Sequence, residues 1–114
     1  MSDCLFCRIV EGEIPSDIVY QDESVIAFRD IQPQAPVHVL VVPRRHISGY
    51  SEANPSDDAL LGAVARAAAH VARQEGIDAT GYRSVVNSGP DAQQSVPHLH
   101  VHVLGGRPLS WPPG

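Results

Sequence analysis

The sequence has no run of positive charge, no long hydrophobic segment and few cysteines. Its 114 residues carry 8 basic and 13 acidic side chains, which gives a net charge of −5. Binding to a nucleic-acid backbone depends on phosphate neutralisation by clustered Lys and Arg, so this composition argues against nucleic acid as a partner. It leaves a single nucleotide open as a ligand.

The amino terminus lacks the features of a targeting segment. Residues 1–4 contain no basic stretch followed by an apolar one, and no window of the chain approaches the length of a membrane span. We therefore expect a cytoplasmic protein without a membrane partner. The two cysteines, Cys4 and Cys7, form a Cys-x-x-Cys pair. In a reducing compartment this spacing indicates metal or redox chemistry before a structural disulfide.

Length and composition predict a single domain, residues 1–114. Hydrophobic residues make up 43% of the chain and charged residues 18%, which are ordinary values for a globular protein. A chain of this length buries roughly 65% of its unfolded surface, enough for a core without disulfides.

Hydrophobic periodicity predicts two helices. Apolar residues from 5 to 10 recur at helical spacing, and the pattern stops at Gly12. A long helix is predicted over 56–75, where apolar residues form one stripe. Ser56 is the predicted N-cap of this helix, and Gly76 suits the left-handed position after its end.

Five segments have the composition of β-strands. They are residues 18–20, 25–28, 37–42, 82–87 and 98–104. The first two flank a polar turn and predict a hairpin, Pro43 ends the third, and a Gly-Gly pair ends the fifth. We predict an α+β fold with a five-stranded antiparallel sheet, one long helix and one short helix.

Three of the six histidines, His98, His100 and His102, alternate with apolar residues. In a strand alternate residues share a face, so the three imidazoles are predicted to point one way, successive rings about 6.6 Å apart. They could form an exposed polar face, or a metal site, although a three-histidine site usually takes a ligand from another element. We favour nucleophilic catalysis on phosphorus, because neutral imidazole has an available lone pair near pH 7 and forms a labile P–N bond.

At these residues the sequence resembles the histidine triad family, whose signature is His-φ-His-φ-His-φ-φ with φ apolar. Residues 98–104 read His-Leu-His-Val-His-Val-Leu and match it completely. Segments 28–36 and 43–48 and the tail 104–114, which ends Trp-Pro-Pro-Gly, resemble the nucleoside phosphoramidase branch. That ending distinguishes the branch from the dinucleoside polyphosphate hydrolases.

The resemblance implies hydrolysis of P–N bonds in purine nucleoside 5′-phosphoramidates, with a purine nucleoside monophosphate as the bound product. It implies that His100 is the nucleophile and forms a nucleotidyl-histidine. It also implies that His102 and Ser95 hold the phosphate, with His38 and Asn87 beside them.

The resemblance implies a set of nucleoside contacts as well. Asp30 is the implied ligand of the ribose hydroxyls, and a carboxylate suits a vicinal diol because it accepts two hydrogen bonds. Six apolar residues match positions that line the base pocket: Leu5, Phe6, Ile9, Phe28, Ile31 and Leu40. Taken singly, each is explained equally well as plain core.

The loop 88–95 and Pro97 depart from the family pattern. Ala92 and Gln93 stand where this branch often has glycine, and Pro97 stands where an aromatic is common. Because a Cβ limits both φ and close approach, backbone N–H contacts from this loop to phosphate have less support than the side-chain assignments, and we assign none.

Many members of the family bind a structural zinc ion. The matching ligands in this sequence are Cys4, Cys7, His46 and His98. Such a Cys2His2 set is closed, and it would join the N-terminal helix to the histidine strand. Taken alone, the Cys-x-x-Cys pair fits a chance pair, a redox site or half a zinc site equally well. His70, outside the apolar stripe of the long helix, is predicted to be a surface residue.

The resemblance also implies a homodimer in which the two sheets join and the tail with Trp111 reaches toward the partner's site. Two alternative functions stay open. One is hydrolysis of dinucleoside polyphosphates, and the other is a nucleotide-binding or zinc-binding regulatory protein. The second is disfavoured because binding alone does not require a nucleophile such as His100.

Overall fold

The computed structural model describes residues 3–114 and contains one antiparallel sheet with two α-helices. The elements are α1 (Leu5–Val10), β1 (Ile18–Gln21), β2 (Val25–Arg29), β3 (Val37–Pro43), the 3-10 turns η1 (Tyr50–Glu52) and η2 (Pro55–Asp57), α2 (Asp58–Gln74), β4 (Tyr82–Val85), the 3-10 turn η3 (Pro90–Ala92) and β5 (Val101–Gly105). The strand order is β1-β2-β3-β5-β4. The predicted fold class is confirmed. No helix within residues 3–114 has both the length and the hydropathy that crossing a membrane requires.

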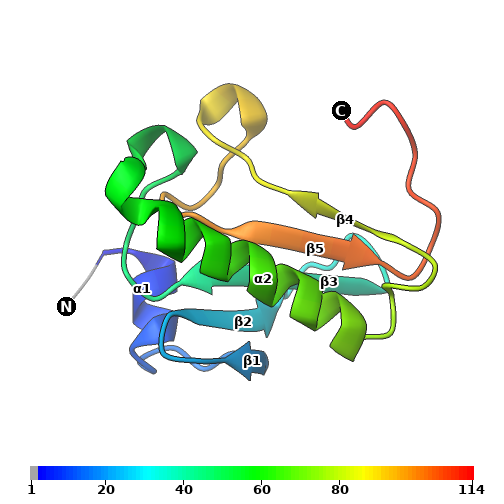
Figure 1. The fold of residues 1–114 in the computed structure, drawn as a ribbon, viewed down its shortest axis with the longest axis horizontal. Coiled ribbons are helices and arrows are strands. Elements are labelled where there is room, and N and C mark those ends of the chain that lie inside the picture. The colour runs from blue at the N-terminus through cyan, green and yellow to red at the C-terminus, as the bar shows by residue number, and fades with distance from the viewer. Residues whose placement is uncertain (1–2) are drawn as a thin grey trace.

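The two helices cover opposite faces of the sheet (Figure 1). Successive side chains of a strand point to opposite faces. On β3, Val39 and Val41 pack in the cluster that contains α2, whereas Leu40 and Val42 pack in the cluster that contains α1. The sheet therefore has two buried faces, which explains why the central strands read as continuous hydrophobic runs.

The histidine segment keeps this alternation: its three imidazoles point one way, as predicted, and they lie on the α1 side. The rings of His98 and His100 lie 6.0 and 5.0 Å from the Phe6 ring of α1, and the rings of His100 and His102 lie 5.0 Å apart. Val101 and Val103 belong to the cluster on the α2 face.

The fifth strand is shorter than predicted, because it begins at Val101 and not at His98. The facing end of β3 is Pro43, which has no N–H to donate to a ladder. Leu99 instead donates its N–H to the Ile47 carbonyl at 2.6 Å. The fourth strand also stops early, at Val85, which faces His102 near the start of β5.

The long helix begins two residues later than predicted, and Ser56 is not its N-cap. Residues 55–57 form a 3-10 turn that leads into α2. Asn54 caps this turn: its Oδ1 accepts the Ser56 N–H at 3.1 Å, and its own N–H donates to Asp57 Oδ2 at 3.0 Å. At the other end Gly76 has φ +75°, as predicted for the residue that follows a helix C-cap.

The tail after β5 runs past β4 (Figure 1). The Arg83 guanidinium of β4 lies 5.6 Å from the centre of the Trp111 ring. Arg107 donates to the Gln34 carbonyl at 2.8 Å, which fastens the start of the tail to the loop between β2 and β3.

Candidate active site and metal cluster

A cavity of about 410 Å³ opens on the α1 side of the sheet, beside the histidines. Ten of the predicted contact residues line it: Leu5, Phe6, Ile9, Phe28, Asp30, Ile31, Leu40, Ser95, His100 and His102. His38 and Asn87 are not part of its wall. The sequence did not indicate six other lining residues, Ile14, Pro15, Ser16, Arg29, Gln32 and Val96, which come from connecting segments and strand ends without a recognisable pattern.

The cavity wall contains both apolar and polar side chains. Phe6 belongs to the apolar part of the wall, and its ring meets the Phe28 ring edge to face at 5.5 Å and the His100 ring at 5.0 Å. The polar part includes the two triad histidines, Ser95 and Asp30. Ile31 is 94% exposed, so it lies at the mouth of the cavity and not in the core. This arrangement suits a ligand that combines a flat apolar group with polar or anionic groups.

His100 is held with one ring nitrogen available for chemistry. Its Nδ1 lies 2.7 Å from the carbonyl oxygen of His98. A carbonyl can only accept, so Nδ1 carries the proton, and in the neutral ring Nε2 keeps its lone pair. The ring is 3% exposed and stands in the cavity wall. This geometry fixes the orientation of the ring and, in its neutral form, directs the lone pair of Nε2 to nucleophilic attack.

His38 and His102 form a chain of hydrogen bonds that fixes both of their tautomers. The Gln34 N–H donates to His38 Nδ1 at 3.0 Å, so the proton of the neutral His38 ring is on Nε2. That Nε2 lies 2.9 Å from His102 Nδ1, which must accept. The proton of His102 is therefore on Nε2, which is buried and has no hydrogen-bond partner among the described residues. A ligand oxygen would satisfy this donor.

Both rings of this pair are neutral at pH 7. Burial, together with the neighbouring His100 and His38, lowers the pKa of His102 to about 4, against the opposing effect of Asp30. Burial also lowers the pKa of His38, against the opposing effect of Asp30, whose Oδ2 lies 3.4 Å from His38 Nε2. The tautomer assignment above therefore holds at neutral pH.

Asp30, His38 and His102 also bring three ligand-type atoms within 4.8 Å of one another. A metal-bound histidine usually donates its second ring N–H to an acceptor. His38 Nδ1 instead accepts the Gln34 N–H, so its Nε2 is protonated and cannot bind a cation while that bond is intact. We assign these three residues to hydrogen bonding and not to a metal site.

The four predicted metal ligands, Cys4, Cys7, His46 and His98, converge at the start of α1. His98 Nδ1 lies 3.3 Å from Cys4 Sγ, 3.4 Å from Cys7 Sγ and 3.2 Å from His46 Nδ1, and Cys7 Sγ lies 3.4 Å from His46 Nδ1. A tetrahedral zinc ion requires N···N edges of about 3.3 Å and S···N edges of about 3.6 Å. The donor set and its spacing therefore fit Zn²⁺.

His98 belongs to the cluster through its side chain and to the active site through its backbone. It is completely buried, and its Nε2 lies 2.8 Å from the Pro43 carbonyl, so Nε2 carries the proton and the Nδ1 lone pair faces the cysteines. Its own carbonyl accepts the His100 Nδ1–H. Burial lowers the pKa of His98, which favours the neutral ring that a metal needs.

The loop that leads to Ser95 is shaped by a residue in an uncommon conformation. Gln93 has φ +61°, in the left-handed region that glycine adopts most easily. Glycine is common at this position in the branch that the sequence resembles. Asn87, at the start of the loop, is partly buried outside the cavity wall.

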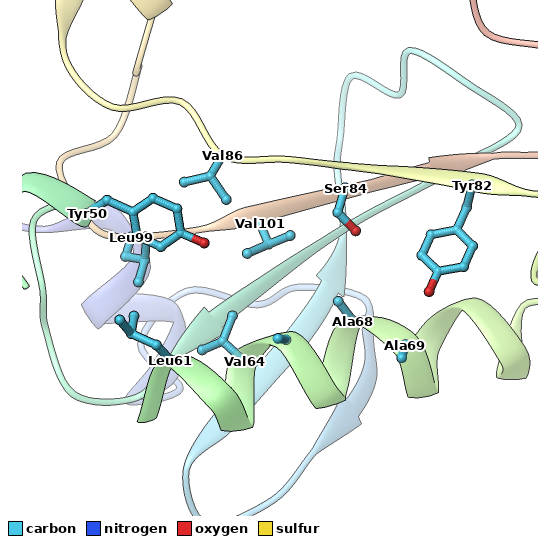
Figure 2. Close-up of a pocket in the computed structure, with 11 residues that line it drawn as sticks. Tyr50, Leu61, Val64, Ala68, Ala69, Tyr82, Ser84, Val86, Leu99 and Val101 are labelled. Carbon is cyan, nitrogen blue, oxygen red and sulfur yellow. The ribbon is translucent and has the colours of Figure 1, made fainter. Parts of the chain in front are cut away.

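A second hollow, of about 220 Å³, lies on the other face of the sheet (Figure 2). Leu61 and Val64 of α2 point toward Leu99 and toward Val101 of β5, and Tyr82 lies at the other end. The lining contains no histidine, cysteine or acidic residue. The hollow offers mainly hydrophobic contact, with hydroxyl groups from Ser84, Tyr50 and Tyr82. His70 is exposed on α2, as predicted.

Fold and site together define a class of protein in which alternating histidines on one strand of an antiparallel sheet line a cavity with both apolar and polar walls. A family model described as the HIT domain matches residues 11–109, and the chain belongs to this family.

Relatives of known structure and sequence agree with the family assignment. The structure of a HIT family hydrolase from Legionella pneumophila is 46% identical, with a TM-score of 0.96, and the match covers 98% of this chain and 100% of the other. A histidine triad nucleotide-binding protein from Candida albicans is 29% identical, with a TM-score of 0.83 over 98% of this chain and 85% of the other. A 14 kDa zinc-binding protein of Zea mays is 49% identical, over 99% of this chain and 89% of the relative.

Proposed function

We propose that the protein hydrolyses the P–N bond of purine nucleoside 5′-phosphoramidates through a nucleotidyl intermediate on His100. The observation that carries the proposal is the bond from His100 Nδ1 to the His98 carbonyl, which leaves the Nε2 lone pair free at the cavity wall. The names of the Legionella hydrolase and of the Candida nucleotide-binding protein support a hydrolase with a nucleotide ligand.

In this proposal the apolar part of the cavity wall binds the purine, and the polar part binds the ribose and the phosphate. The purine packs against the apolar wall formed by Phe6 and its neighbours. Asp30 accepts hydrogen bonds from the ribose hydroxyls, and its Oδ1 is held by the Gln32 N–H at 2.8 Å. The His102 Nε2–H and the Ser95 hydroxyl donate to the phosphate oxygens, which supplies the partner that Nε2 lacks.

The reaction divides into two displacements at phosphorus. The His100 Nε2 lone pair forms an N–P bond while the bond to the departing amine breaks, and the amine nitrogen takes the electron pair and a proton from a water molecule. The hydroxide that remains then attacks phosphorus and the N–P bond to His100 breaks, so that amine and nucleoside monophosphate leave. The bond to the His98 carbonyl stabilises the positive charge that His100 acquires in the intermediate.

We further propose that Zn²⁺ binds Cys4, Cys7, His46 and His98 as a structural ion. The fit of the four ligand atoms to a tetrahedron and the names of the plant relatives support it. When bound, the ion supplies crosslinking between α1 and the histidine segment and takes no part in the displacement.

We also propose a homodimer in which β4 strands of two copies pair. β4 is an edge strand, and the hollow of Figure 2 lies beside it with Tyr50 and Tyr82 50% and 37% exposed. A second copy would cover this apolar surface. Light scattering on the parent and on Tyr82→Lys tests this proposal. We expect the parent to be a dimer and the variant to be a monomer. A monomeric parent would contradict the proposal.

The activity is tested with an adenosine 5′-phosphoramidate that releases an amine, using the parent, His100→Ala and His70→Ala. We expect the parent and the His70 variant to react alike, since His70 is exposed on α2 away from the cavity. Loss of the nucleophile should lower the rate by about 10⁴-fold or more. Preference for a dinucleoside polyphosphate, measured in parallel, would favour the alternative hydrolase. Equally slow reaction in all three proteins would favour a nucleotide-binding regulatory role.

A further inference from the structure

The side-chain amide of Gln94 binds three backbone groups, two in its own loop and one in a distant segment. Its Oε1 accepts the Gly89 N–H at 3.0 Å, and its Nε2 donates to the Ser48 carbonyl at 2.7 Å and to the Val96 carbonyl at 3.0 Å. Both N–H groups and the oxygen of the amide are therefore used. Gln94 lies outside the wall of the large cavity, so these bonds connect protein to protein and leave nothing for a ligand.

These bonds enclose Ser95. The contact from the Gln94 side chain to the Val96 carbonyl spans Ser95, and the Gln94 N–H also donates to the Gly89 carbonyl at 3.1 Å. Gly89 and Gln94 are thus bonded twice, once through the backbone and once through the side chain. Ser95 follows directly and lines the cavity beside His100 and His102.

The bond to Ser48 ties this loop to a second part of the molecule. Ser48 Oγ lies 3.4 Å from Nε2 of His46, one of the four residues of the metal cluster. The two segments also touch closely, because a Cβ on Gly49 would lie 3.2 Å from Ser88 Oγ and 3.4 Å from Gln94 Oε1. The loop before Ser95 is consequently held against a segment that the cluster itself anchors.

We propose that Gln94 is a positioning residue for the phosphate end of the active site. It holds the backbone around Ser95 so that the Ser95 hydroxyl and the His102 N–H face the same group. The inference rests on the proposed function, since it assumes that a phosphate occupies this end. The hydrogen bonds of the Gln94 side chain reach neither Phe6 nor Asp30, so the affinity it controls is that of the phosphate and not that of the nucleoside.

Two variants of Gln94 separate the effect of side-chain shape from the effect of its three hydrogen bonds. Gln94→Met keeps the length of the side chain and removes all three bonds. Gln94→Glu keeps an acceptor for the Gly89 N–H but sets an oxygen against the Ser48 and Val96 carbonyls. Gln93→Glu is the matched control, because it adds the same charge one residue earlier on an exposed side chain for which the structure shows no hydrogen bond.

Calorimetric dissociation constants for AMP and for adenosine, measured on parent and variants, test the inference. We expect both Gln94 variants to bind AMP roughly tenfold or more weakly, as a lost hydrogen bond to a charged group predicts, and to bind adenosine within about twofold of the parent. The Gln93 variant should keep most of its AMP affinity. Adenosine affinity also reports that each variant is folded.

Three results would overturn the inference, and they differ from one another. Equal losses for AMP and adenosine would mean that Gln94 supports the fold in general. Unchanged AMP affinity in both Gln94 variants would mean that Ser95 does not depend on it. A parent that binds adenosine and AMP equally well would show that no phosphate site exists here, which would remove the proposed function and this inference with it.

Discussion

Mild acid should destabilise the protein through His102. Burial lowers the pKa of this histidine to about 4, whereas a histidine in an unfolded chain titrates near 6.5. Between these values the unfolded state binds a proton that the folded state does not. The free energy of unfolding therefore falls as the pH falls from about 6.5 to about 4, and the contribution of the neutral ring is complete only above this range.

The two pKa values set the size of the effect. The difference between about 6.5 and about 4 corresponds to about 3 kcal/mol below pH 4 and to about 2 kcal/mol at pH 5. Burial also lowers the pKa values of His38 and His98, so the total loss in the parent is larger. Only a comparison with a variant isolates the part that belongs to His102.

His102→Asn provides this comparison, because its amide oxygen can accept the His38 Nε2–H in place of Nδ1. Urea unfolding of parent and variant at pH 7, 6 and 5, with zinc at one fixed concentration, gives the free energies. We expect the parent to lose about 2 kcal/mol more than the variant between pH 7 and pH 5. Equal losses in both proteins would refute the assignment of His102 as a buried neutral ring.

Three further predictions concern the loop, the ribose contact and the metal cluster. Gln93→Gly should raise the free energy of unfolding by up to about 1 kcal/mol, because glycine adopts the left-handed φ of 61° without strain. A lower free energy of unfolding in urea would contradict this prediction. Asp30→Asn should reduce the ratio by which the protein binds AMP more tightly than 2′-deoxy-AMP, although Asn can still accept the Gln32 N–H. If this ratio of affinities is unchanged in the variant, the ribose contact is ruled out. Chelation of zinc should lower the midpoint temperature of thermal unfolding of the parent but not that of Cys7→Ser. If the parent has the same midpoint with and without chelator, a structural ion is excluded.

Much of the fold could be predicted from the sequence because it depends on local periodicity. The alternation of apolar residues with His100 and His102 fixes which face each ring occupies, whatever the strand length. The apolar stripe of α2 and the glycine after it gave that helix and its end within one or two residues. Its beginning was misjudged, because Ser56 and Asn54 are both good capping residues and only the backbone shows which of them caps the turn.

The remaining features depend on contacts between distant backbone groups. Strand β5 starts at Val101 because Leu99 bonds to the Ile47 carbonyl, a partner that no pattern in either segment indicates. The tautomers of His38 and His102 depend on one backbone N–H, that of Gln34. The bonds of Gln94 reach 46 residues back along the chain to Ser48. Residue types predicted which groups could take part in chemistry, but not which nitrogen carries each proton.

The central claim is that the Nε2 atom of His100 becomes covalently bonded to phosphorus. The most direct measurement is to mix the protein with an adenosine 5′-phosphoramidate, quench within milliseconds in base, where the N–P bond survives, and map the labelled peptide by mass spectrometry. The account predicts an adenylyl group on His100 in the parent and in His70→Ala, and none in His100→Ala. Amine release by the parent without any adduct, or with the adduct on another residue, would contradict it.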